Sequence, residues 1–184
     1  MSIKSTVNKS FLDKMGQKDY SAMLSVNPTN QTDYDIGKIQ SVIDKYSGGK
    51  SPVNAEMIVE SSKRTGTPVD MYLVMGASES HFGTKGRAVG TKNIYNVGNT
   101  DGGDGNSAND PRFAKYNNFQ KDWAVGLDTF GNLISKQYFP DNNPDLDAFI
   151  ANDFRRPDGA RYMTSSAAKD NIVSLRSRIR GMLA

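Results

Sequence analysis

The chain has 184 residues, which is enough for one domain with a sizeable core. It contains no cysteine and a single histidine, so a disulfide framework, a thiolate metal site and a histidine-based metal cluster are all excluded. A net charge of +3 favours approach to polyanions, but no basic run is interleaved with aromatic residues, so nucleic-acid binding is not predicted.

The first 31 residues are polar and differ from the rest of the chain. They predict either a short helix or an N-terminal arm that becomes ordered on a partner. No apolar segment of signal-peptide length occurs there, and no stretch of the sequence is long and apolar enough to span a membrane. We therefore expect synthesis in the cytoplasm without a Sec-type signal, with residues 32–184 forming the folded domain.

Two amphipathic helices are predicted at the start of this domain. The first begins at Thr32 or Asp33 and ends at Gly48-Gly49, and the second begins at Ser51-Pro52 and ends near Gly66. A third helix follows with almost no linker, so we expect the second and third helices to pack as a hairpin.

The third helix is apolar on nearly all sides, which indicates a core helix. We predict Thr67 as its N-cap, Pro68 at its first position and Gly83 as its end. Glu79 falls on the face that also carries Tyr72, Met75 and Gly76.

Partial burial of Glu79 would raise the pKa of its carboxyl group and favour the protonated form that a general acid needs. The alternative is a glutamate at a helix end that simply reaches water. His81, two residues further on, is expected to be structural because it lies about 200° around the helix from Glu79.

The segment 83–111 is rich in glycine and predicts a small irregular lobe, in which residues 94–97 form a short strand or an extended rim. Its acidic residues do not have the spacing of a calcium-binding loop, so we predict no metal and no cofactor. These acidic residues are Asp101, Asp104 and Asp110.

The remainder of the chain is predicted to be helical, over residues 119–134, around 146–150, and from Ser165 or Ser166 to about residue 182. The arginines of the last helix are expected to form a solvated face; they are Arg176, Arg178 and Arg180. The predicted fold class is therefore mainly α, with one small irregular or short β lobe.

Four motifs in order resemble those of the glucosaminidase branch of the lysozyme-like superfamily, which consists of bacterial and phage peptidoglycan hydrolases. They are S-E-S-H-F-G-T at 78–84, K-N-I-Y-N-V-G at 92–98, R-F-A-K-Y-N-N-F at 112–119 and A-R-Y-M at 160–163. The match covers roughly residues 52 to 182. The resemblance implies a lysozyme-like helical domain that cleaves the glycan strands of peptidoglycan.

The resemblance also implies roles for individual residues. Glu79 would be the general acid that protonates the glycosidic oxygen, and Tyr116 would support the sugar or the transition state. The groove would be lined by Asn93, Asn96 and Gly98, with Tyr95 and Phe82 as rings for sugar stacking or, alternatively, as core residues. Thr84 and Asn118 stand where the family pattern has serine.

Several alternatives remain open at this stage. The same acid could serve a lytic transglycosylase, in which the 6-hydroxyl group of the sugar replaces water, or the chain could be an inactive glycan-binding or structural component. No second carboxylate is singled out by its spacing. The polar arm and the lack of a signal favour a phage-borne hydrolase that acts on the cell wall, either attached to a virion or secretion machine through residues 1–31 or released through a holin.

Overall fold

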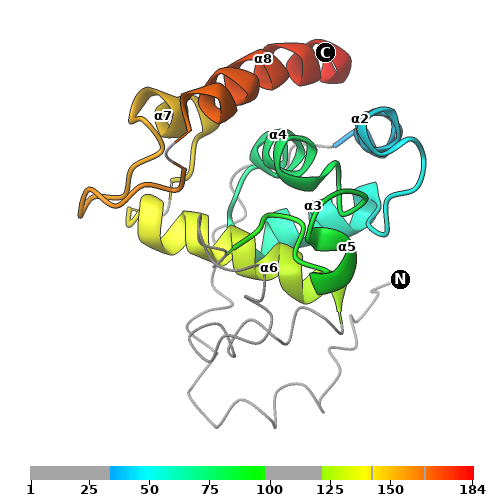
Figure 1. Ribbon diagram of the computed structural model, residues 1–184, viewed down its shortest axis with the longest axis horizontal. Helices are drawn as coiled ribbons and strands as arrows, with labels where there is room; N and C mark the ends of the chain where they lie inside the picture. The colour runs from blue at the N-terminus through cyan, green and yellow to red at the C-terminus, as the bar shows by residue number, and fades with distance from the viewer. Residues whose placement is uncertain (1–33, 98–121, 142, 164) are drawn as a thin grey trace, which may run out of the picture. The chain divides into compact units, whose positions relative to one another are not determined.

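The computed structural model describes residues 34–97, 122–141, 143–163 and 165–184, which belong to one unit, Tyr34–Ala184. The described part contains seven α-helices and a short π-helix, and no β-strand (Figure 1). The prediction of a mainly α fold is confirmed. The predicted N-terminal arm and residues 98–121 of the glycine-rich lobe lie outside the described residues.

The first two described helices are α2 (Ile36–Ser47) and α3 (Ala55–Thr65), and each ends at the glycine that the sequence predicted. Gly48 and Gly66 adopt the left-handed conformation that favours glycine, with φ of 66° and 74°. Both helices begin later than predicted. The side chains of Asp35 and Asn54 accept hydrogen bonds from backbone N–H groups in the first turn, and these residues are therefore the N-caps.

Helix α4 (Val69–Ser80) is buried in nine of its twelve residues and contacts α2, α3 and α8 (Figure 1). The predictions of a core helix and of a pair with α3 are confirmed. The predicted ends are wrong, however. Pro68 occupies the N-cap position, and the Thr67 hydroxyl group donates to the carbonyl of Gly131 at 2.9 Å. The helix ends before Gly83, because His81 already has a positive φ of 48°.

After α4 the chain forms turns and the four-residue helix α5 (Ala88–Thr91). Residues 94–97 also lie in turns, so the short strand that the sequence allowed there is absent from the described part of the lobe. The loop nevertheless belongs to the core, because Ile94, Tyr95 and Val97 are all buried.

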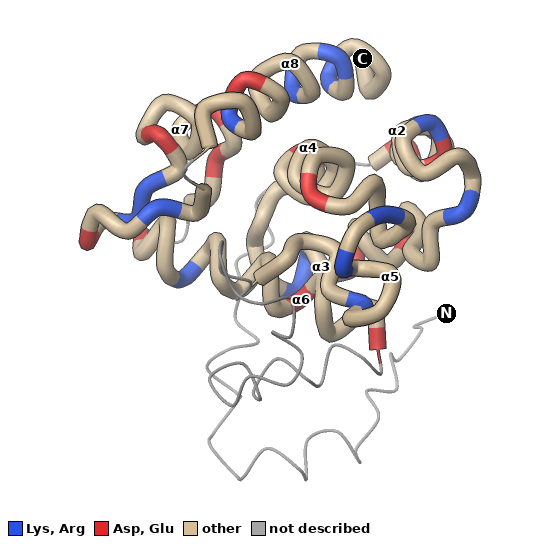
Figure 2. The backbone as a smooth tube through the Cα atoms, viewed as in Figure 1, with Lys and Arg blue, Asp and Glu red and all other residues tan. Residues whose placement is uncertain are grey.

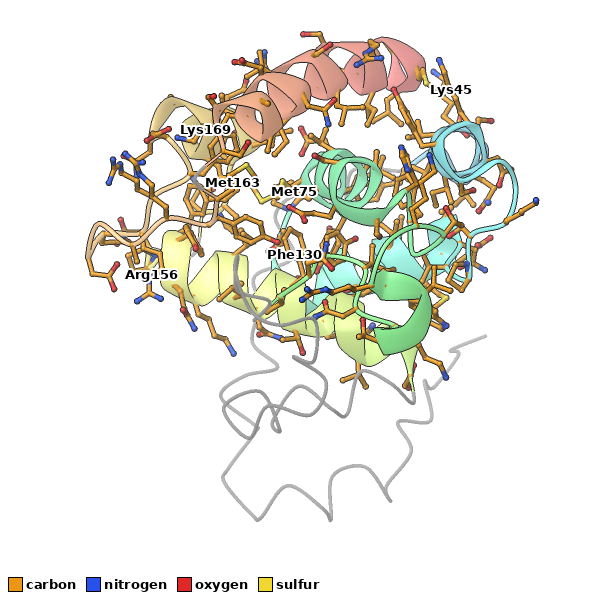
Figure 3. The ribbon with its side chains drawn as sticks, in the orientation of Figure 1. Lys45, Met75, Phe130, Arg156, Met163 and Lys169 are labelled. Carbon is orange, nitrogen blue, oxygen red and sulfur yellow. The ribbon has the colours of Figure 1, made fainter. Side chains whose placement is uncertain are left out.

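Helix α6 (Trp123–Leu133) begins at the N-cap Asp122 and continues directly into the π-helix η5 (Ile134–Tyr138). It packs on α3 and against the side of α4, where the ring centroids of Tyr72 and Phe130 lie 5.4 Å apart. Figure 3 shows Met75 of α4 and Phe130 of α6 pointing into the interior, and both side chains are fully buried.

The chain ends with α7 (Leu146–Ala151) and α8 (Ser166–Leu183), and the predicted cap Ser165 is confirmed by its bond to the backbone of α8. The prediction of a solvated arginine face is wrong for two of the three arginines. Arg180 pairs with Asp70 of α4 at 2.6 Å and with Asp147 of α7 at 2.9 Å. Arg176 also pairs with Asp147, at 2.5 Å. Figure 2 shows basic positions along α8 and acidic positions on α4 and α7.

Candidate functional site

Glu79 is the penultimate residue of α4, and its side chain is half-buried. The side-chain amide Nδ2 of Asn96 donates to its Oε2 at 3.1 Å and to its backbone carbonyl at 3.3 Å. The carboxyl group is therefore held between the end of a buried helix and the loop that follows α5. Asn96 has a positive φ of 49°, a conformation that asparagine adopts more readily than most residues.

Ser80, the last residue of α4, joins the helix end to this loop. Its buried hydroxyl group donates to the carbonyl of Ile94 at 2.8 Å and accepts from the backbone N–H of Gly83 at 2.8 Å. Its own carbonyl accepts from the backbone N–H groups of Thr84 and Lys85. One residue thus fixes both the turn after α4 and the loop that brings Asn96 to Glu79.

The side chain of Asn93 is hydrogen-bonded to the backbone of the loop that carries Asn96. It is buried, its Nδ2 donates to the carbonyl of Val97 at 2.8 Å, and its Oδ1 accepts from the backbone N–H of Val97 at 3.2 Å. The backbone N–H of Asn96 also donates to the carbonyl of Asn93 at 3.2 Å. Of the two asparagines predicted to bind substrate, Asn96 therefore contacts Glu79, whereas the amide of Asn93 is bonded to the loop backbone.

The two predicted stacking rings both lie in the core. Phe82 is fully buried on Gly76 of α4, and a Cβ atom added at Gly76 would lie 2.8 Å from the ring. Tyr95 is 1% exposed and stacks on Phe130 with ring centroids 3.9 Å apart. Its hydroxyl group donates to the carbonyl of Tyr72 at 3.3 Å, and burial raises the pKa of Tyr95 well above its ordinary value. With both rings covered, the packing supports the core alternative.

The structure adds Tyr162 to the site, a residue to which the sequence analysis gave no role. Its hydroxyl group donates to the carbonyl of Tyr95 at 2.9 Å. Burial raises the pKa of Tyr162 well above its ordinary value, and the nearby negative charge of Glu79 raises it further. The phenol therefore stays protonated at pH 7. The A-R-Y-M motif at 160–163 contains Tyr162 and could have drawn attention to it, but the motif does not indicate which residue this tyrosine contacts.

His81 ends α4 and is half-buried. Its carbonyl accepts from the hydroxyl group of Thr84 at 2.8 Å. Burial lowers the pKa of its imidazole below the ordinary value, and the positive charge of Lys85 lowers it further, so the ring is neutral at pH 7. These contacts give His81 a part in the turn after α4.

The predicted site residues Gly98 and Tyr116 lie outside the described residues, as do the acidic residues of the lobe, to which no role was assigned; these are Asp101, Asp104 and Asp110. Within the described ranges, no three histidine, cysteine, aspartate or glutamate side chains are grouped so that they could hold a metal ion. No helix in the described part of the chain is both long enough and apolar enough to cross a membrane.

Comparisons of this chain with protein-family models, with curated proteins and with solved structures gave no match.

Proposed function

We propose that this protein cleaves the glycan strands of bacterial peptidoglycan, with Glu79 as the general acid. The observation that carries the proposal is the placement of Glu79, which is half-buried at the end of a core helix and accepts a hydrogen bond from Asn96. The proposal includes a lysozyme-like arrangement of the domain. The order of the motifs along the chain supports it, since the buried helix ends in S-E-S and the K-N-I-Y-N-V-G turn returns to it.

A general acid in glycoside cleavage gives its proton to the oxygen of the bond that breaks. The proposal requires that partial burial and a position in the last turn of a helix, where the free carbonyl groups gather, keep Glu79 protonated against the Asn96 amide, whose hydrogen bond favours the carboxylate. The amide of Asn96 fixes one carboxyl oxygen, so the direction of proton transfer would be set before substrate binds. The bond to the glycosidic oxygen breaks as Glu79 gives up its proton, and a water molecule or a sugar hydroxyl group attacks the anomeric carbon and releases a proton to a base that the proposal leaves unassigned.

The site is built so that the carboxyl group has little freedom to move. Glu79 follows a run of buried residues on a helix that contacts three others. The loop that carries Asn96 is held through the hydroxyl group of Ser80 and through the side chain of Asn93. Such support is what a catalytic group requires in order to stay within a fraction of an ångström of its working position.

Digestion of purified peptidoglycan by the wild-type protein, Glu79→Gln and Glu60→Gln tests the proposal. Glu60 is a suitable control because it is an exposed glutamate on α3 whose ion pair with Arg64, at 3.6 Å, is also exposed. We expect wild type and Glu60→Gln to release soluble muropeptides at equal rates and Glu79→Gln to release none. Activity in Glu79→Gln would overturn the role of the glutamate. Binding without release by all three proteins would instead indicate a glycan-binding or structural protein.

A further inference from the structure

A cluster of charged side chains lies on the segment that precedes Tyr162. We call it the arginine cluster, and it consists of Asp153, Arg155, Arg161 and Lys169. The Asp153 carboxylate lies 3.4 Å from Nε of Arg155 and 3.2 Å from Nη2 of Arg161, and it also pairs with the ammonium group of Lys169 on α8. Three cations therefore share one carboxylate, and the cluster has a net charge of two positive units.

The backbone places the two arginines opposite each other. Arg155 and Arg161 form an isolated antiparallel β-bridge, and the N–H of Tyr162 donates to the carbonyl of Phe154 at 2.8 Å. Like charges on directly opposite residues of such a pair repel each other. Both guanidinium side chains are nevertheless more than a third exposed, at 38% and 37%, so a ligand in solution can reach them. Figure 2 shows basic positions on the segment between α7 and α8, which contains this bridge.

The turn that presents Asp153 to the arginines has a costly backbone conformation. Asp153 and Phe154 are consecutive non-glycine residues with φ of 55°, in the left-handed region that L-residues avoid. Burial of the Phe154 ring, which lies 5.0 Å from that of Phe149, keeps the turn in place. Strain of this kind is concentrated at sites where surrounding structure fixes a functional group.

The cluster lies next to the candidate site along the chain. Arg161 directly precedes Tyr162, whose hydroxyl group bonds to the loop that also carries Asn96. Neighbouring residues of an extended segment point to opposite sides, so Tyr162 faces the interior and Arg161 the solvent.

We propose that the arginine cluster binds the carboxylate groups of the peptide stems of peptidoglycan, an inference that rests on the proposed function. The planar guanidinium group binds carboxylates through two parallel hydrogen bonds. One oxygen of the Asp153 carboxylate contacts both arginines, so the two guanidinium groups converge on a single carboxylate position. Stem peptides supply further carboxylates that would balance the excess positive charge. The protein would thus favour glycan that carries stems over glycan without them.

The test is a pelleting assay with the full-length chain on two insoluble substrates, peptidoglycan with its stem peptides and the same material after amidase has removed them. We expect the wild-type protein to bind the intact material about tenfold more tightly, the difference expected for loss of a charge-assisted contact. The double variant Arg155→Gln/Arg161→Gln should bind both materials equally. Arg178→Gln is the control, because Arg178 bonds to Ser174 of its own helix, α8, and carries the same charge.

Several outcomes would overturn the proposal. Equal binding of the wild type to both materials would overturn it even if the double variant failed to fold. If the double variant bound both materials more weakly than the wild type by the same factor, the cluster would have a structural role only, and the proposal would also be overturned. Loss of wild-type binding after removal of teichoic acids, with no effect of stem removal, would assign the cluster to phosphate groups. The assay measures binding alone, so a protein that binds through the cluster but cleaves nothing would leave this inference standing while the proposed function fails.

Discussion

Replacing Gly76 with alanine should destabilise the protein, because the added methyl group has no room. The new Cβ atom would lie 2.8 and 2.9 Å from two ring carbons of Phe82. That ring is fully buried and its residue has a positive φ of 55°, so it cannot move aside freely. Overpacking of this kind costs up to about 3 kcal/mol, and alanine in place of glycine inside a helix returns about 1 kcal/mol. The net loss should therefore be up to about 2 kcal/mol.

Thermal unfolding measures this loss directly. For a chain of this size, about 2 kcal/mol corresponds to a fall in Tm of roughly 4–8 °C. The matched control is Gly181→Ala in α8, where an added Cβ meets no atom within 4 Å. The control should leave Tm unchanged or raise it slightly, since helix propensity alone acts there. A Gly76→Ala protein as stable as wild type would refute the packing of Phe82 on α4, and with it the support described for the turn after Glu79.

Three further changes probe the site and its framework. Ser80→Ala removes a buried hydroxyl group that pairs two backbone groups, and urea unfolding should show a loss of about 1–3 kcal/mol. Asn96→Ala leaves Glu79 without that amide, so muropeptide release should fall at least about tenfold, as expected for a misplaced catalytic group; release at the wild-type rate would contradict this role. The pKa of Asp147 is lowered to about 2 by hydrogen bonds to two arginines of α8. Its stabilising contribution is therefore present above the ordinary pKa of 3.8 and lost as the pH falls towards 2. Asp147→Asn should lower Tm at pH 6 and have a much smaller effect near pH 2, whereas an equal effect at both pH values would exclude this linkage.

The sequence was most informative where local chemistry decides the structure. The ends of α2 and α3 were predicted correctly, because a left-handed glycine ends a helix whatever surrounds it. The burial of α4 was also predictable, since its apolar residues leave no side for solvent. The first residues of α2 and α3 were not predicted correctly, because several neighbouring polar residues can act as caps and tertiary packing selects one.

The site depends on contacts between distant parts of the chain, which sequence spacing does not reveal. Glu79 could be singled out from its helix, but the bond from Tyr162 to the loop that carries Asn96 requires the fold of the 154–163 segment. Phe82 and Tyr95 were ambiguous because aromatic rings suit both a core and a sugar-binding surface. Arg180 has the pattern of an exposed residue, and only the packing of α8 brings it to Asp70.

Mass spectrometry of peptidoglycan digested by the wild type and by Glu79→Gln tests the central claim most directly. The account predicts new glycan ends in the wild-type digest and none in the Glu79→Gln digest. A reducing N-acetylglucosamine end would identify a glucosaminidase, a reducing N-acetylmuramic acid end a muramidase, and an anhydro end a lytic transglycosylase. Identical ends in both digests, or intact glycan in both, would contradict glycan cleavage by Glu79.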